Sequence, residues 1–316
     1  MTYDCVIVGG GPAGLSAALM LGRCRRRVLL CDVGRQRNIR AREIHAYPTR
    51  DCTSPAEYLR MARDELERYG TIECRELEIA EATKEGRGFV ACAADGTRLT
   101  TRKLLLATGV VDELPDLEGL DELYGISVHH CPYCDAWEWR DRPLAVYGGG
   151  DHGPGLALSL TAWSADVLLC TGGSVIPQDA TARLSAAGIV VRGEPVLRLE
   201  GKRGLLERIV FAGGDAVSRS ALFVCNDQRQ RSPLAERLGC RLTEKGMVDT
   251  GRCEATNVSG LYVAGDASKE AQFVVVAAAE GAEAGMAIHK ALIEEDLAHS
   301  TRVSRATSAA EGRGTM

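Results

Sequence analysis

The sequence predicts an α/β protein, because one pattern of apolar strand, glycine-rich loop, helix and second strand occurs twice within 316 residues. The first copy runs from residue 5 to residue 32, and the second from residue 143 to residue 170. Both copies have the form of a dinucleotide-binding unit of the Rossmann-like kind. We therefore expect two such units in one chain.

The first copy contains the full dinucleotide fingerprint. Gly9 permits the tight turn, Gly11 lets the backbone approach a pyrophosphate, and Gly14 lets the helix pack against the strand. Asp32 ends the second strand, where a carboxylate accepts hydrogen bonds from a ribose. A glycine-rich structural turn is the alternative. The residues expected to contact the dinucleotide are Gly9, Gly11, Pro12, Ala13, Gly14 and Asp32.

The second copy repeats the glycine spacing but ends differently. Its loop contains Gly148, Gly150, Asp151, His152 and Gly153. After its second strand, residues 171–174 read Thr-Gly-Gly-Ser, with no acid for a ribose 2′-hydroxyl and no arginine cluster for a 2′-phosphate. Arg183 is the nearest arginine downstream. We expect the fold of an NADPH or NADH site here, while the choice among NADPH, NADH and neither stays open.

A pair of cysteines lies just before the second copy, in the segment HHCPYCD at 129–135. Cys131 and Cys134 are close enough in sequence to form a small disulfide ring. Pro132 suits the first turn of a helix. The N–H groups and positive dipole end of such a helix lower the pKa of a thiol. We predict a redox-active dithiol and disulfide.

Three side chains beside this pair are candidates for proton transfer. Asp135 follows the second cysteine directly, and His129 or His130 is an additional base, with a surface histidine as the alternative for each. The same residues form half of a zinc site, so a zinc-binding structural or regulatory module is a remote alternative. No second Cys-x-x-Cys or His-x₃-His follows, and we expect no metal.

Composition narrows the functional classes. The chain is 45% hydrophobic and 26% charged, with a net charge of −5 and no basic stripe, which argues against nucleic-acid binding. The apolar stretch 273–288 is broken by Glu280 and Glu283, which argues against a membrane span. No targeting segment precedes the first strand, so we expect a cytoplasmic protein. Residues 297–316 are small and polar, and we expect a disordered tail.

Two other regions are expected to contact a ligand. The loop 35–51 is polar and basic and contains Arg37, Asn38 and His45, with a solvated surface loop as the alternative. A buried strand ends in Gly265-Asp266, where a carboxylate suits a ribitol or ribose hydroxyl. An Ala-rich helix follows at 273–294, and its N-terminal dipole favours negative charge.

Taken in order, these motifs resemble the low-molecular-weight thioredoxin reductases, which are class II pyridine nucleotide-disulfide oxidoreductases. The resemblance covers residues 3–295. It implies two three-layer ββα domains, with the second inserted into the first. Residues 1–112 and 246–296 would form an FAD-binding domain, and 113–245 an NAD(P)-binding-like domain that carries the Cys-Pro-Tyr-Cys motif. The resemblance adds three residues to the cofactor contacts, namely Thr108, Gly109 and Gln272.

The resemblance also implies roles and partners. Cys134 would lie nearer the flavin, Cys131 would exchange with substrate, and Asp135 would handle the proton, in a homodimer. The Arg37-Asn38 and His45 loop, the Pro-Tyr pair between the cysteines and Ala271-Gln272 are similar to the branch that contains the gliotoxin and holomycin dithiol oxidases.

We therefore predict an FAD-dependent thiol–disulfide oxidoreductase. It passes electrons between flavin, the Cys131–Cys134 pair and a thiol or disulfide substrate, with NAD(P)H as donor. The substrate is a small protein or a small molecule. The main alternative is an oxygen-dependent dithiol oxidase that forms a disulfide in a small molecule, and a flavin-binding sensor without turnover is a remote one. The sequence names neither the substrate nor the direction.

Overall fold

The computed structural model describes the backbone of residues 2–311 and the side chains of residues 2–301. The chain forms two compact units. Unit 1 comprises Met1–Gln36, Leu59–Val110 and Gln230–Met316, and unit 2 comprises Arg37–Tyr58 and Val111–Arg229. The second nucleotide-type fold is thus inserted into the first, as predicted.

The boundaries of these units differ from the expected divisions after residues 112 and 245. Residues 230–245 belong to unit 1 because Leu234, Ala235 and Cys240 are buried in its hydrophobic core. The loop 37–58 belongs to unit 2, where Arg37 pairs with Asp112.

Unit 1 is built on a seven-stranded sheet with the order β3-β2-β1-β6-β5-β4, in which β17 also pairs with β6. Its strands are β1 (Thr2–Val8), β2 (Val28–Asp32), β3 (Ile72–Glu76), β4 (Ile79–Glu85), β5 (Gly88–Ala93), β6 (Arg98–Leu106) and β17 (Leu261–Val263). The strands β3, β2, β1, β6 and β17 are parallel, whereas β4 and β5 are antiparallel. Val8 lies opposite Cys31 and Leu106, and Val263 lies opposite Leu106, so four parallel strands end at one edge. Ligands of such sheets bind at this edge.

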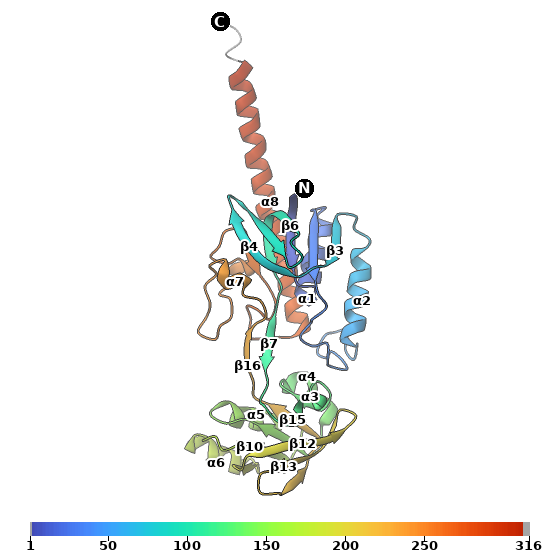
Figure 1. Cartoon of the computed structure of the whole chain (residues 1–316), viewed down its shortest axis with the longest axis vertical. Coiled ribbons are helices and arrows are strands. Elements are labelled where there is room, and N and C mark those ends of the chain that lie inside the picture. The colour runs from blue at the N-terminus through green and yellow to red at the C-terminus, as the bar shows by residue number, and fades with distance from the viewer. Residues whose placement is uncertain (1, 312–316) are drawn as a thin grey trace. The chain divides into compact units, whose positions relative to one another are not determined.

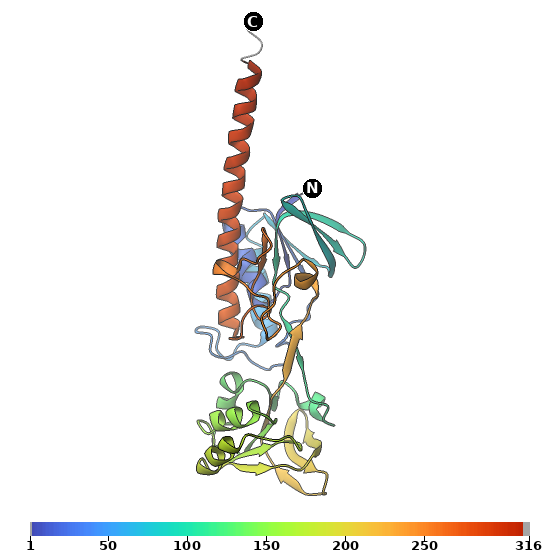
Figure 2. The same ribbon diagram turned by 90° about the vertical axis from the view of Figure 1, so that its left-hand side faces the viewer.

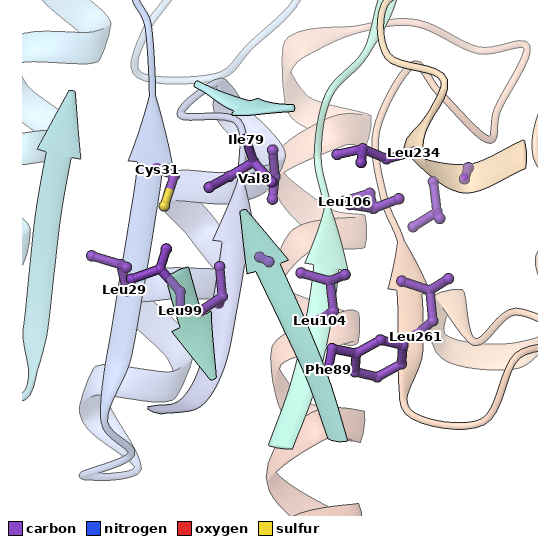
Figure 3. Close-up of a cluster of buried hydrophobic side chains, with 14 of the residues drawn as sticks. Val8, Leu29, Cys31, Ile79, Phe89, Leu99, Leu104, Leu106, Leu234 and Leu261 are labelled. Carbon is purple, nitrogen blue, oxygen red and sulfur yellow. The ribbon is translucent and has the colours of Figure 1, made fainter. Parts of the chain in front are cut away.

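The core of unit 1 is formed by side chains of its parallel strands together with those of β4 and β5. Leucine, valine and phenylalanine side chains from five strands meet there, and Leu234 joins them from α7 (Leu234–Arg237) (Figure 3). Helices α1 (Pro12–Arg23) and α8 (Val274–Glu311) pack on each other (Figure 1). A Cβ at Gly281 would overlap the Ala13 carbonyl oxygen, so this glycine permits the close approach.

Helix α8 is longer than the sequence predicts. We expect a helix at 273–294 and a disordered tail from 297, but the structure continues α8 to Glu311 as one helix (Figure 2). Residues 298–311 contain no glycine or proline, so nothing in the backbone ends the helix. Residues 312–316 of the expected tail lie outside the described residues.

Unit 2 has the predicted three layers. A parallel sheet of order β11-β10-β9-β15-β8 forms the middle layer, and an antiparallel sheet of order β12-β13-β14 packs on one face. Helices α5 (His152–Leu160) and α6 (Gln178–Ala186) cover the other face. The strands are β8 (Val128–His129), β9 (Leu144–Tyr147), β10 (Val167–Cys170), β11 (Val190–Arg192), β12 (Val196–Lys202), β13 (Leu205–Phe211), β14 (Ala216–Ser218) and β15 (Ala221–Val224).

Short elements complete the chain. They are β7 (Val110–Glu113), which pairs with β16 (Asp227–Gln230), helices α2 (Pro55–Leu66), α3 (Leu120–Leu123) and α4 (Pro132–Asp135), and the 3₁₀ turns η1 (Ala136–Trp139) and η2 (Arg252–Glu254). Among the described helices, none combines the length and apolar character that a bilayer span requires.

Candidate functional site

The first glycine loop of unit 1 forms a cradle at the start of α1. A Cβ at Gly9, where φ is +110°, would overlap the Ala107 carbonyl oxygen, and one at Gly14 would overlap the Gly9 carbonyl oxygen. A Cβ at Gly11 would instead point into open space. Gly11 is the N-cap of α1 and no side chain caps the helix, so its first N–H groups face this space. The cradle therefore fits a diphosphate group.

Asp32 lies beside the glycine loop at the end of β2. Its Oδ1 accepts a hydrogen bond from the Gly10 N–H at 3.0 Å, and its Oδ2 accepts from Gln36 Nε2 at 2.8 Å and Arg63 Nη2 at 2.5 Å. The carboxylate is thus fixed where the fingerprint requires the ribose acceptor. Sequence reasoning missed Arg63, because it lies 31 residues away on α2.

The other predicted cofactor residues of unit 1 follow neighbouring strands at the same edge of the sheet. Thr108 and Gly109 follow β6, whereas Gly265 and Asp266 follow β17, which pairs with β6. Gln272 lies just before α8 and its side-chain amide donates to the Lys269 carbonyl at 3.3 Å.

A buried carboxyl group lies behind this edge. The Gly265 N–H donates to Glu280 Oε2 at 2.7 Å. Burial raises the pKa of Glu280 to about 7, although the Gly265 hydrogen bond acts in the opposite direction. In the sequence Glu280 only interrupts an apolar stretch, so sequence reasoning missed its hydrogen bond to the Gly265 N–H.

The two cysteines of unit 2 form a disulfide, with their Cα atoms 5.3 Å apart. Cys131 is the N-cap of α4, which begins at Pro132 as predicted. The helix is only one turn long and continues as η1. Its dipole is therefore much weaker than that of the regular helix that the sequence predicts.

His129 is the histidine beside Asp135. It is buried, and its Nε2 accepts a hydrogen bond from Trp139 Nε1–H at 3.0 Å. Because an indole nitrogen only donates, the imidazole proton is placed on Nδ1. Nδ1 lies 3.3 Å from Asp135 Oδ1, so Trp139 orients His129 to donate toward this carboxylate.

His130 is held in a different network. Its Nδ1 lies 2.8 Å from the Tyr124 hydroxyl and its Nε2 lies 3.1 Å from Arg37 Nη2. Burial and the nearby Arg37 charge lower the pKa of His130, which favours the neutral ring. Both nitrogens therefore have partners other than Asp135, and the base role of His130 stays a prediction.

Asp112 anchors that network. It accepts two hydrogen bonds from Arg37, at 2.6 and 2.8 Å, and further ones from Asn226 and Gln228 at 2.8 and 3.2 Å. Burial raises the pKa of Asp112, but Arg37, His130 and Asn226 outweigh burial and hold it below its usual value. Sequence reasoning missed this carboxylate because its partners lie up to 116 residues away.

The other residues of the predicted ligand loop have contacts inside unit 2. The Asn38 carbonyl accepts a hydrogen bond from the Ala41 N–H at 2.9 Å. His45 lies among the carboxylates of Glu43, Asp51 and Glu138, at 3.5 to 3.8 Å.

The second glycine loop has the fingerprint geometry, and one of its N–H groups is bonded within its own chain. A Cβ at Gly153 would overlap the Gly148 carbonyl oxygen, the same close packing that Gly14 permits in unit 1. The Gly150 N–H, however, donates to the Val175 carbonyl at 3.1 Å. A Cβ at Gly149 would overlap the Ser174 side chain. The segment after β10 therefore lies against the loop, as Asp32 lies against Gly10 in unit 1, and a Cβ at Gly150 would point into open space.

The surrounding charges do not favour a phosphate either. Asp151 is the exposed N-cap residue of α5, and His152 begins that helix, so a negative charge lies near the helix N-terminus. Arg183 is exposed on α6. Arg192, at the end of β11, pairs with Glu194 at 2.8 Å and stacks on Phe211.

The chain combines two dinucleotide-type folds with a Cys-x-x-Cys disulfide. This combination is typical of flavoprotein thiol–disulfide oxidoreductases. The family model described as pyridine nucleotide-disulphide oxidoreductase matches residues 3–281, so the chain belongs to this family of oxidoreductases.

Known proteins resemble the chain over most of its length. It is 30% identical to thioredoxin reductase sirT of Leptosphaeria maculans, over 96% of this chain and 98% of that protein. The crystal structure of HlmI superimposes with a TM-score of 0.94 at 34% identity, covering 97% of this chain and 98% of that one. A probable thioredoxin reductase of Arthroderma benhamiae is 36% identical, and the match spans 54% of this chain and 44% of that protein.

Proposed function

We propose that the chain is an FAD-dependent dithiol oxidase, which forms a disulfide in a small thiol substrate through the Cys131–Cys134 pair. One observation carries the direction of this proposal. In the nucleotide loop of unit 2 the Gly150 N–H is bonded to the Val175 carbonyl, so this N–H is not directed at the diphosphate of a nicotinamide donor. The likeness to the dithiol oxidase branch supports the same direction.

The cradle of unit 1 supports FAD as the cofactor. Gly11 and the uncapped start of α1 suit its diphosphate, and Asp32 suits its ribose. Gly265 and Asp266 follow β17 at the same sheet edge, where they suit the ribitol. When bound, FAD supplies a two-electron acceptor that returns electrons to oxygen.

The residues of unit 2 support the thiol exchange itself. A substrate thiolate attacks Cys131 Sγ, the Cys131–Cys134 bond breaks, and Cys134 leaves as a thiolate. The second substrate thiol then attacks the substrate sulfur of the mixed disulfide and releases Cys131. The substrate is oxidised to a disulfide, and the cysteine pair is reduced to two thiols.

Two protons move from substrate to cysteines in this exchange. Asp135 accepts a proton from the first substrate thiol and delivers it to the Cys134 sulfur, and the proton of the second substrate thiol passes to the released Cys131 sulfur. His129 donates its Nδ1–H toward Asp135 and thereby orients the carboxylate. The homodimer and the cytoplasmic location expected from the sequence are part of the same proposal.

A second candidate function is an NAD(P)H-dependent disulfide reductase. It is favoured by the retained glycine geometry of the second loop, because Gly148 and Gly153 still pack as a fingerprint requires. In this direction Cys131 would attack a substrate disulfide after the pair is reduced.

Oxygen uptake with a small dithiol tests the proposal. Cys134→Ser should abolish turnover and retain yellow, flavin-bound protein, because it removes the leaving thiolate but no cradle residue. Cys74→Ser is the control, since Cys74 is an exposed free thiol on β3 of unit 1. Full turnover by Cys134→Ser would refute the role of the pair.

A further inference from the structure

Two aromatic side chains of unit 2 are exposed beside the redox disulfide. Among the phenylalanine, tyrosine and tryptophan residues that the structure describes, only Tyr133 and Trp137 are exposed, at 65% and 62%. Tyr133 lies between Cys131 and Cys134 in the sequence, and Trp137 is in the turn that follows. Exposed apolar groups that gather beside a reactive centre indicate a binding surface, whereas single ones scattered over a protein do not.

The burial pattern of the redox segment explains why both rings face solvent. Pro132 and Ala136 are buried, and Ala136 belongs to the core that β9, β10 and α5 form. Tyr133 and Trp137 each follow one of these residues directly and so have the same spacing along the turn. Most of the area of each ring therefore lies outside the core and is available to a ligand.

Neighbouring side chains hold the two rings in place. The Tyr133 ring meets Trp163 edge to face, with 6.0 Å between the ring centroids and 79° between the planes, and Trp163 packs against the core of unit 2. The Arg140 guanidinium lies over Trp137, with its Cζ 4.3 Å from the ring centroid, and Arg140 Nη1 donates to the Trp137 carbonyl at 2.8 Å. Rings that are already ordered lose less conformational entropy when a ligand binds them.

The chemistry of this surface indicates what it binds. Residues 135–142 carry both carboxylates and guanidinium groups, so neither sign of charge dominates. An aromatic face binds another flat ring through offset stacking or edge contacts. Two side chains offer far less area than the roughly 800 Å² per partner of a stable protein interface. The surface therefore suits a flat, uncharged small molecule better than a protein.

We propose that Tyr133 and Trp137 form a stacking surface for the substrate, and that they select small dithiols that carry an uncharged aromatic ring. This inference rests on the proposed function and adds the substrate class to it. Stacking would hold the ring of the substrate while its thiols reach the disulfide, and Cys131 and Cys134 are only half-buried. Both aromatic residues position the substrate and take no part in the exchange of bonds.

Binding without reaction is the direct test. The probe is the bis-S-methyl ether of ortho-xylylene dithiol, which has the aromatic ring but cannot exchange with the disulfide. We expect saturable quenching of tryptophan fluorescence in the flavin-bound protein, and Trp137→Phe should remove most of this response. Tyr133→Ser should weaken binding about fivefold, the size expected for the loss of one aromatic pair, whereas Tyr133→Phe should retain it. Leu205→Ser is the control, because it removes an exposed apolar side chain on β13.

Selectivity in turnover is the second test. The aromatic ortho-xylylene dithiol and linear butane dithiol close disulfide rings of the same size, so they differ mainly in the flat ring. We expect the ratio of kcat/KM for the aromatic dithiol to that for the linear one to fall about fivefold in Tyr133→Ser. Tyr133→Phe should retain the ratio, with circular dichroism to confirm the fold of each variant.

The two tests separate this inference from the proposed function. Probe binding that Tyr133→Ser weakens, without turnover of either dithiol, would support the stacking surface and refute the oxidase. Turnover with a ratio that Tyr133→Ser leaves unchanged, or equal probe binding by Tyr133→Ser and the unaltered protein, would overturn the stacking surface. A preference for a reduced protein dithiol over both small dithiols, lost in Tyr133→Ser, would assign the surface to a protein partner and would also overturn it.

Discussion

The pairing of His129 with Asp135 gives the sharpest prediction about the thiol exchange. His129→Leu removes the Nδ1–H that faces Asp135, whereas His129→Asn places an amide N–H at nearly the same position. Both variants leave the Trp139 N–H without its present acceptor. The difference in kcat between them therefore reports the contact with the Asp135 carboxylate. The contact is long, at 3.3 Å, and a hydrogen bond to a charged group contributes about 1.5–3 kcal/mol.

The lower end of this range corresponds to about tenfold in rate. We therefore expect kcat for dithiol oxidation to fall about tenfold in His129→Leu, with KM nearly unchanged, and to recover in His129→Asn. The assay is oxygen uptake under saturating dithiol, with flavin content and thermal unfolding measured for each variant. Equal losses in the two variants would show that His129 acts through packing and would refute the orienting role.

Two other predictions concern unit 1. Gly11→Ala should keep the thermal stability of the apoprotein but lose flavin, because its methyl group enters the open cradle, whereas Gly14→Ala should be destabilised even as apoprotein because the methyl meets the Gly9 carbonyl. Flavin content and the unfolding midpoint separate these effects, and flavin retention by Gly11→Ala would contradict the cradle. Glu280→Gln should remove a pH dependence of stability. The pKa of folded Glu280 is raised to about 7. Protonated Glu280 therefore contributes on the order of 3 kcal/mol to the free energy of unfolding below about pH 4.5, and this contribution is lost as pH rises through 7. Denaturant unfolding of both proteins at several pH values measures this, and parallel pH curves would refute the assignment.

Local sequence determines the parts of the fold that could be predicted. The glycine loops, the acid at the end of β2 and the start of α4 at Pro132 depend on residues within about one turn or strand of each other. Some of these positions require a backbone conformation that few residue types adopt, such as the positive φ at Gly9, so the residue type indicates the local structure.

The parts that could not be predicted depend on contacts distant in sequence. The Trp139 N–H and Asp135 contact His129, whereas Tyr124 and Arg37 contact His130. In the second glycine loop the Gly150 N–H is bonded to the Val175 carbonyl. The anchoring of Asp112 requires Arg37 and Asn226, which are 75 and 114 residues away. Periodicity and spacing carry no information about such pairs.

The most direct test of the central claim is anaerobic mixing of the purified protein with NADPH, NADH or a small dithiol, while the flavin absorbance is followed. We predict that only the dithiol bleaches the flavin, and that admitting air restores the colour with formation of peroxide. Rapid bleaching by either nicotinamide nucleotide would show that the segment at Ser174 and Val175 admits the donor. The protein would then be a disulfide reductase, and the proposed direction would be contradicted.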